Sequence, residues 1–151
     1  MRLLPLLLLA GCLKPTMLQA PTPVSVEIVA ILDQGTPVAA PPALADRLAQ
    51  ELTKRNLTPQ KVEGLAVSGD KAFLIVESSA RFSSQINGRY RWTVTVNAIV
   101  SPAEGQASTK EFTVPVHLVY YKDKEPEAVA EAAPLIARQV GALLDDWIRS
   151  L

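Results

Sequence analysis

The feature that most constrains the fold is a pair of long segments that meet at Asn87-Gly88. Residues 72–86 (AFLIVESSARFSSQI) are apolar in their first half and polar in their second, and residues 89–100 (RYRWTVTVNAIV) alternate between apolar and polar side chains. Asn-Gly favours a type I′ turn, because both central residues of that turn need a positive φ. The pattern predicts an antiparallel hairpin with one buried face and one face in water.

Further strands are expected on both sides of this hairpin. Residues 24–32 (VSVEIVAIL) predict the first strand, residues 33–41 a loop, and residues 61–67 a short strand or an irregular approach. Residues 109–121 (TKEFTVPVHLVYY) predict the last strand. Pro115 has no N–H to donate, so we expect that strand at a sheet edge or with a bulge.

Two amphipathic helices complete the pattern. Residues 42–56 predict a helix, because Leu44, Leu48 and Leu52 recur every four residues, and Asn56 can adopt the left-handed conformation that ends a helix. The chain is expected to be helical again from Pro126 to its end. A proline inside a helix costs about 3 kcal/mol, so Pro134 predicts a kink or a short helix followed by a longer one.

These elements predict an α+β fold with the order β-α-β-β-β-α. A sheet with one wet face and two amphipathic helices forms a two-layer sandwich with both helices on the apolar side. We expect a mostly antiparallel, four-stranded sheet in which the first helix is a crossover and the later strands form a meander. Trp92 and Trp147 are expected in the core.

The first twelve residues, MRLLPLLLLAGC, have the pattern of an export signal. A positive residue, a short apolar run and small residues before a cleavage site are typical of secretory signals, and the run is too short to span a bilayer. The ending Leu9-Ala10-Gly11-Cys12 resembles the lipobox of bacterial lipoproteins. That resemblance implies cleavage before Cys12 and lipidation of Cys12, the only cysteine in the chain. The alternatives are an ordinary secretory signal that contains a cysteine, and a misplaced start codon.

The domain organisation follows from this interpretation. Residues 1–11 are expected to be the signal peptide, residues 12–23 a lipidated cysteine with a flexible, proline-containing tether, and residues 24–151 a single α+β domain. Leu13 stands where lipoproteins of the enteric type carry Asp if they stay in the inner membrane. By that resemblance we expect the periplasmic face of the outer membrane.

Composition and motifs argue against catalysis. Lys and Arg number 15 and Asp and Glu number 15, so the basic field typical of nucleic-acid binding is absent. The chain has a single histidine, His117, and Cys12 is expected to be lipidated, so a metal site is not expected. Asp145 and Asp146 are adjacent on the expected helix and should lie on a solvated surface. We therefore expect no enzyme, no cofactor and no metal.

Three arginines near the hairpin turn are the remaining candidate contact site. Arg89 and Arg91 share a strand face by the period of two, and whether Arg81 joins them depends on the register. Guanidinium groups pair well with phosphate and carboxylate, which favours a contact with lipopolysaccharide or an acidic partner. The alternative is a polar outer face that uses arginine for solubility and edge protection.

Most of the chain after the signal resembles the LptE family of outer-membrane lipoproteins that assemble lipopolysaccharide. The closest similarity is in residues 89–105 (RYRWTVTVNAIVSPAEG), a strand that runs through T-V-N-A into a Pro/Gly turn. The helix over residues 42–56 and the terminal helix, which ends in paired Asp, an aliphatic residue, Arg and Leu, are also similar. Pro134 departs from the usual family pattern. No site residue can be transferred by motif.

The resemblance implies a non-catalytic accessory or plug subunit of a lipopolysaccharide-translocating complex. The implied partners are an outer-membrane β-barrel protein (LptD-like), lipopolysaccharide, and the membrane through the lipid on Cys12. Two alternatives stay open. One is a lipoprotein subunit of another envelope complex, such as a lipid-transport auxiliary or a secretion machine. The other is a periplasmic ligand-binding lipoprotein.

Overall fold

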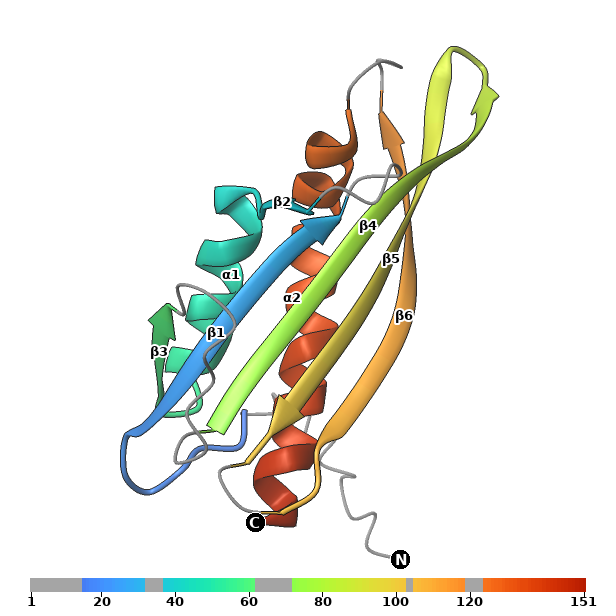
Figure 1. The fold of residues 1–151 in the computed structure, drawn as a ribbon. Helices are drawn as coiled ribbons and strands as arrows, with labels where there is room; N and C mark the ends of the chain where they lie inside the picture. The colour runs from blue at the N-terminus through green and yellow to red at the C-terminus, as the bar shows by residue number, and fades with distance from the viewer. Residues whose placement is uncertain (1–14, 32–36, 62–71, 103–104, 119–123) are drawn as a thin grey trace, which may run out of the picture.

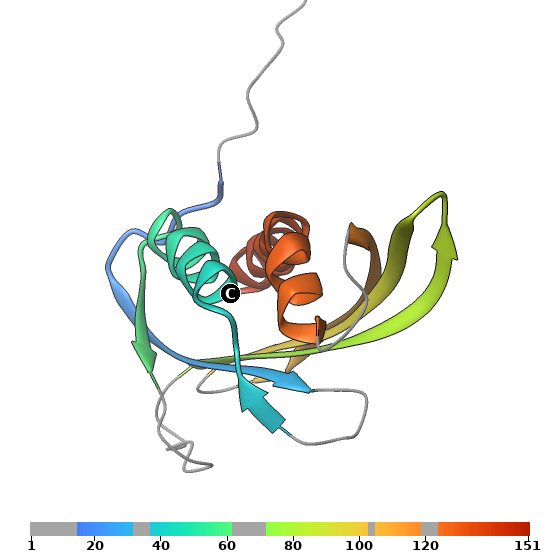
Figure 2. The same cartoon turned by 90° about the horizontal axis from the view of Figure 1, so that it is seen from above.

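A computed structural model describes residues 15–31, 37–61, 72–102, 105–118 and 124–151. These residues form a two-layer α+β sandwich, in which one sheet carries both helices on the same face (Figures 1 and 2). The predicted fold class and the placement of the helices are therefore confirmed. The other face of the sheet has no second layer over it in the described part of the chain.

Four strands form the body of the sheet: β1 (Thr22–Ile31), β4 (Ala72–Ile86), β5 (Arg89–Ser101) and β6 (Ser108–Leu118). β1 pairs with β4 in parallel, so the segment between them, which contains the first helix, is a crossover. β4, β5 and β6 form the predicted antiparallel meander. The hairpin turn is as expected, because Asn87 has φ 49° and Gly88 has φ 73°.

In the described part of the chain the sheet has six strands rather than the four predicted. β2 (Pro37–Ala39) pairs antiparallel with the end of β1, and β3 (Leu57–Lys61) pairs in parallel with its beginning. β2 is only three residues long, and β3 reads LTPQK, so neither has the length or the alternation that marks a strand in sequence. Of the segment expected as a short strand, residues 62–67 lie outside the described residues.

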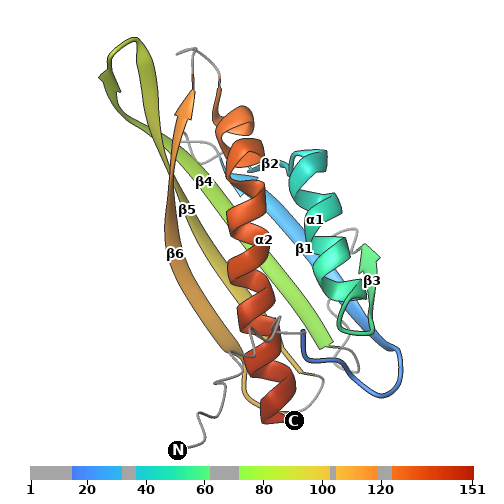
Figure 3. The same ribbon diagram turned by 180° about the vertical axis from the view of Figure 1, so that it is seen from behind.

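The two helices are α1 (Pro42–Thr53) and α2 (Glu125–Ser150), which lie side by side over the sheet (Figure 3). Of the two outcomes expected at Pro134, a short helix followed by a longer one is wrong, because α2 continues through this residue, and a kink stays a prediction. Pro134 is exposed, and the solvent side of a helix tolerates a lost hydrogen bond better than the packed side does. Asn56 has φ 61°, so it takes the left-handed conformation expected near the end of α1.

The core lies between the helices and one face of the sheet. Leu44, Leu48 and Leu52 of α1 are fully buried, and burial of each such side chain stabilises the fold by about 1.5–3 kcal/mol. Trp92 and Trp147 are each 3% exposed, as expected for core residues. From the sheet the core receives the predicted alternating side chains of β5, among them Val94, Val96, Ala98 and Val100.

The open face of the sheet changes in character along the strands. At one end, Ile75 lies opposite Ile99, and both are half-buried. Next, Glu77 and Glu111 lie opposite Asn97 from the two neighbouring strands. Serine and threonine follow, and the arginines lie toward the hairpin turn. β6 ends the sheet, which confirms the edge position that Pro115 predicted.

Candidate functional site

The described chain begins against the helix layer. The backbone N–H of Thr16 donates to Asp145 Oδ1 of α2 at 3.1 Å. The N–H of Leu18 donates to the Arg55 carbonyl at 3.1 Å, and the Asn56 side-chain amide donates to the Leu18 carbonyl at 3.1 Å. The N–H of Thr22 donates to the Asn56 carbonyl at 3.1 Å. Much of the segment expected as a tether is thus attached to the end of α1 and to α2.

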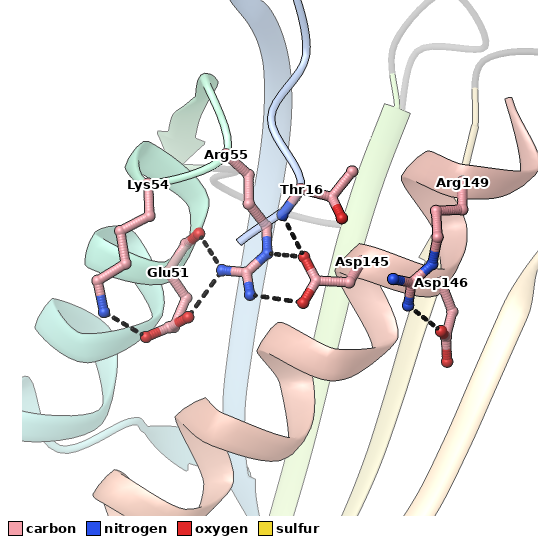
Figure 4. A network of polar contacts seen from close by, with 7 residues as sticks. All are labelled: Thr16, Glu51, Lys54, Arg55, Asp145, Asp146 and Arg149. Atoms are coloured by element: carbon pink, nitrogen blue, oxygen red, sulfur yellow. Dashed lines mark hydrogen bonds and ion pairs between the residues drawn. The ribbon is translucent and has the colours of Figure 1, made fainter. Parts of the chain in front are cut away.

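Arg55 is the centre of this attachment (Figure 4). Its side chain donates from Nε to Asp145 Oδ1 at 2.8 Å and from Nη2 to Asp145 Oδ2 at 3.1 Å. Nη1 donates to Glu51 Oε2 at 2.7 Å and to the Glu51 carbonyl at 2.8 Å. Arg55 is 4% exposed, so its charge is compensated inside the protein rather than by water. We call Arg55, Glu51 and Asp145 the interhelix cluster.

Gly141 makes room for the interhelix cluster. A Cβ atom at this position would lie 2.8 Å from Glu51 Oε2 and 2.9 Å from Arg55 Nη2. Both distances are shorter than side chains tolerate without movement. A glycine in the middle of α2 costs about 1 kcal/mol of helix stability relative to alanine, so its presence here has a packing reason.

The cluster changes the acidity of its members. Burial by itself raises the pKa of Asp145, but the hydrogen bonds and charge of Arg55 outweigh it and hold that pKa below its ordinary value. The pKa of Glu51 is also lowered, because hydrogen bonds from Lys54 and Arg55 outweigh the effect of burial. Burial would lower the pKa of Arg55, but its two carboxylate partners raise it instead. All three groups are therefore charged at neutral pH.

A groove of about 440 Å³ runs between α1 and α2 beside this cluster. Its lining includes four cationic side chains and two carboxylates. Arg47 and Arg138 are exposed and have no ion pair among the described residues. The groove is thus an anion-attracting surface on the outer side of the helices. Its full lining is Arg47, Gln50, Glu51, Lys54, Arg55, Pro134, Ala137, Arg138, Ala142 and Asp145.

The three candidate arginines lie on the opposite, open face of the sheet. Arg81 pairs with Thr93, and after an irregularity between Phe82 and Ser84 the register places Arg91 opposite Ser84 and Arg89 opposite Ile86. Since paired residues share a face, this register brings Arg81 onto the face of Arg89 and Arg91. All three are exposed. We call them the sheet arginines.

The open face also carries the only histidine. His117 of β6 is exposed and lies opposite Arg91 in the pairing of β5 and β6. Among the described residues, no group of three His, Cys, Asp or Glu side chains is placed to hold a metal ion. No helix in the described ranges has the length and apolar character needed to cross a membrane.

The interhelix cluster was not identified from the sequence. Asp146 is a solvated residue as expected, with its side chain 73% exposed, but Asp145 is the partner of a buried arginine. The available signals were the four-residue spacing of Glu51 and Arg55 and a glycine within an otherwise regular helix. Cys12 lies outside the described residues.

Comparisons with known proteins agree with the fold. No protein-family model matches the chain, and no curated protein matches it in sequence. A solved structure of a Xanthomonas campestris protein of the DUF330 family has a TM-score of 0.50 at 15% identity, over 93% of this chain and 92% of that one.

Two further solved structures are lipoproteins by their descriptions. A minor lipoprotein from Acinetobacter baumannii has a TM-score of 0.48 at 16% identity, over 81% of this chain and 94% of that one. A Caulobacter crescentus protein described as a lipoprotein has a TM-score of 0.47 at 14% identity, over 83% of this chain and 90% of that one. At these identities the Xanthomonas campestris structure supports a shared fold, and the two lipoproteins add no argument beyond it.

Proposed function

We propose that this chain is a bacterial lipoprotein of the outer membrane that acts as a non-catalytic accessory subunit of a lipopolysaccharide-translocating complex. The observation that carries the proposal is the attachment of residues 16–22 to the helix layer. These residues follow shortly after Cys12, where the sequence predicts the lipid. An anchor at Cys12 would hold the domain by its helix side and leave the open face of the sheet for a partner.

The shape of the molecule supports this division. In Figure 2, residues 15–21 lie beside the helices, on the side of the sheet away from its open face. The open face presents paired strands with exposed polar and charged side chains, which suits recognition by a protein or a phosphorylated ligand. The sheet arginines give it a positive end, and guanidinium groups bind phosphate in a bidentate manner.

The assignment to lipopolysaccharide comes from the resemblance to the LptE family together with the sheet arginines. Lipopolysaccharide carries phosphate groups, and three exposed cations on one face are complementary to them. The same resemblance suggests that the partner is an outer-membrane β-barrel protein. The groove between α1 and α2 lies on the outer side of the helices, and buried side chains of the described residues pack between the helices and the sheet. This arrangement favours a surface-contact role over a ligand-binding pocket.

The second candidate function is a lipoprotein subunit of another envelope complex. A shared fold with the Xanthomonas campestris protein does not distinguish complexes, because one fold hosts many functions. The same anchored orientation would serve a lipid-transport auxiliary or a secretion machine equally well. The identity of the co-purifying partner separates the two candidates.

The test is a pull-down of the full chain from detergent-solubilised envelopes, with identification of the proteins and lipids that accompany it. We expect a large outer-membrane barrel protein and lipopolysaccharide. The variant Arg81→Gln, Arg89→Gln, Arg91→Gln should lose lipopolysaccharide. The matched control, Arg47→Gln, Arg138→Gln, Arg149→Gln, removes three exposed arginines of the helix layer and should retain it. Co-purification with a different complex would favour the second candidate.

A further inference from the structure

We propose that the groove between α1 and α2 faces the membrane that holds the lipid of Cys12, and that it binds the anionic headgroups of that membrane's phospholipids. The inference rests on one part of the proposed function, the lipid anchor at Cys12. It adds the orientation of the domain and a second, electrostatic contact with the bilayer.

The first argument is the length of chain between the anchor and the groove. Cys12 precedes Thr16 by four residues, which span at most about 14 Å when fully extended. Thr16 is hydrogen-bonded to Asp145, and Asp145 lines the groove. Without this attachment, the twelve residue steps from Cys12 to Val24 could span about 40 Å and the domain could turn freely. With it, the helix layer is confined to the immediate neighbourhood of the bilayer.

The second argument is charge. Within the cluster, the charge of Arg55 is already compensated by Asp145 and Glu51. Arg47 of α1 and Arg138 of α2 remain without an ion pair among the described residues and line the groove from both sides. The exposed acidic residues Asp46 and Glu131 of the same helices are not part of the groove lining.

The third argument is distance along the helix. Arg138 is seven residues before Asp145, which corresponds to about 10 Å along the axis of α2. The electrostatic screening length is about 8 Å at physiological salt, so a cation attracts an anionic surface only when it is this close to it. The short link from Thr16 to Cys12 permits the groove to approach the bilayer within that range when α1 and α2 lie against it. The sheet arginines lie on the opposite face and are directed away from this bilayer.

The experiment measures the orientation of the full, acylated chain on vesicles. Cys12 is consumed by the lipid, so a second cysteine can be labelled alone. Thr53→Cys places a fluorophore on the exposed side of α1, and Thr113→Cys places it on the open face of the sheet. Energy transfer to headgroup-labelled lipid is then compared in vesicles of phosphatidylglycerol with phosphatidylethanolamine and in vesicles of phosphatidylcholine alone.

We expect stronger transfer at position 53 than at position 113 in the anionic vesicles, and a smaller difference in the neutral ones or in high salt. Each arginine near an anionic surface shifts such an equilibrium by about five-fold, so Arg47→Gln with Arg138→Gln should lower the docked population by about 25-fold. The control Arg149→Gln removes an exposed arginine of α2 that does not line the groove, and it should leave the docked population unchanged.

Several outcomes would overturn the proposal. These are equal transfer at the two positions, a difference that is the same in neutral vesicles, and a difference that the groove substitutions do not change. If energy transfer at position 53 changed only after another envelope protein was added, the groove would be a binding site for that protein and not for lipid headgroups, and the proposal would be overturned. Measuring the mass of the mature chain separates the two proposals. If Cys12 carries no acyl chains, the proposed lipid anchor is refuted, and the membrane contact of the groove is refuted with it. If Cys12 is acylated but energy transfer is equal at the two positions, only the membrane contact of the groove is refuted.

Discussion

The interhelix cluster and the sheet arginines use the same kind of side chain in opposite ways. Arg55 is 4% exposed, and its guanidinium group makes hydrogen bonds to two carboxylates and one carbonyl. Arg81, Arg89 and Arg91 are exposed, and no ion pair to a described residue is found for any of them. Arg55 is directed inward and pairs with Asp145, which also accepts the hydrogen bond from Thr16. The sheet arginines are directed toward solvent.

This difference indicates a division of labour between the two faces. A buried, paired arginine constrains geometry, because leaving either partner alone in the interior is costly. Unpaired exposed arginines contribute little to stability and remain able to bind an anion. The helix side therefore orients the domain relative to its N-terminal segment, and the sheet side is available for recognition. Substitutions that break the first face should reduce stability, and substitutions on the second should not.

The largest expected effect is that of Asp145→Ala. It removes the bidentate partner of a buried arginine and the acceptor of the Thr16 N–H, which should cost about 3 kcal/mol in the free energy of unfolding. For a domain of this size that corresponds to a fall in Tm of about 10 °C. The measurement is denaturant or thermal unfolding of the full chain in detergent.

The neighbouring residue supplies the control for this substitution. Asp146 pairs with Arg149 at 2.7 Å, but both side chains are largely exposed. Asp146→Ala should therefore change the free energy of unfolding by less than about 0.5 kcal/mol. If Asp145→Ala and Asp146→Ala lowered the free energy of unfolding equally, the burial of Arg55 would not make its ion pair more stabilising than the exposed pair of Asp146 and Arg149.

The next effect is that of Gly141→Ala. Alanine is the better helix former by about 1 kcal/mol, but its Cβ would displace the side chains of Glu51 and Arg55. Loss of charged hydrogen bonds, at about 1.5–3 kcal/mol each, exceeds that gain, so we expect a net destabilisation of about 1–2 kcal/mol. Unfolding of the variant measures it.

A double substitution tests the reason for this loss. With Arg55→Leu already present, Gly141→Ala has no guanidinium group to displace and should become neutral or stabilising. A loss of the same size in both backgrounds would place the strain elsewhere in the helix pair.

Acid should weaken the interhelix cluster. The pKa values of Asp145 and Glu51 are lower in the folded chain than their ordinary values, so the unfolded chain binds protons first as the pH falls. The stability that these carboxylates contribute is present at neutral pH, and it is lost as the pH falls below their ordinary pKa values and through their lowered ones. The free energy of unfolding, measured between pH 7 and pH 3, should fall less steeply for Asp145→Asn. If the free energy of unfolding of Asp145→Asn fell as steeply with pH as that of the unchanged chain, Asp145 would not be a source of the acid sensitivity.

The main elements of the fold could be predicted because their patterns are local. The alternation of residues 89–100 and the Asn87-Gly88 turn correspond to β5 and its hairpin, and the leucines of α1 are buried as expected. β2 and β3 could not be predicted, since they form through pairing with β1 and not through their own sequence. The predicted division of the helix at Pro134 was wrong, because tertiary position decides how much an interior proline disturbs a helix.

Of the two groups of functional candidates, only the exposed sheet arginines were predicted from the sequence. The sheet arginines could be located by period, and the structure supplied the register that unites them. The interhelix cluster joins residues 90 positions apart in the chain, and such a contact leaves no periodic signal. The attachment of Thr16 to Asp145 spans 129 positions and depends on the same long-range geometry.

The smallest effect on stability is expected for the sheet arginines. The variant Arg81→Gln, Arg89→Gln, Arg91→Gln should change the free energy of unfolding by less than about 0.5 kcal/mol, because exposed, unpaired charges contribute little and removal of like charges relieves repulsion. Its binding of lipopolysaccharide should nevertheless fall, as measured by co-purification. Substitutions in the interhelix cluster would then change the free energy of unfolding, and substitutions of the sheet arginines would change the binding of lipopolysaccharide. A triple variant that unfolds readily would instead make these arginines part of the framework and remove the contrast between the two faces.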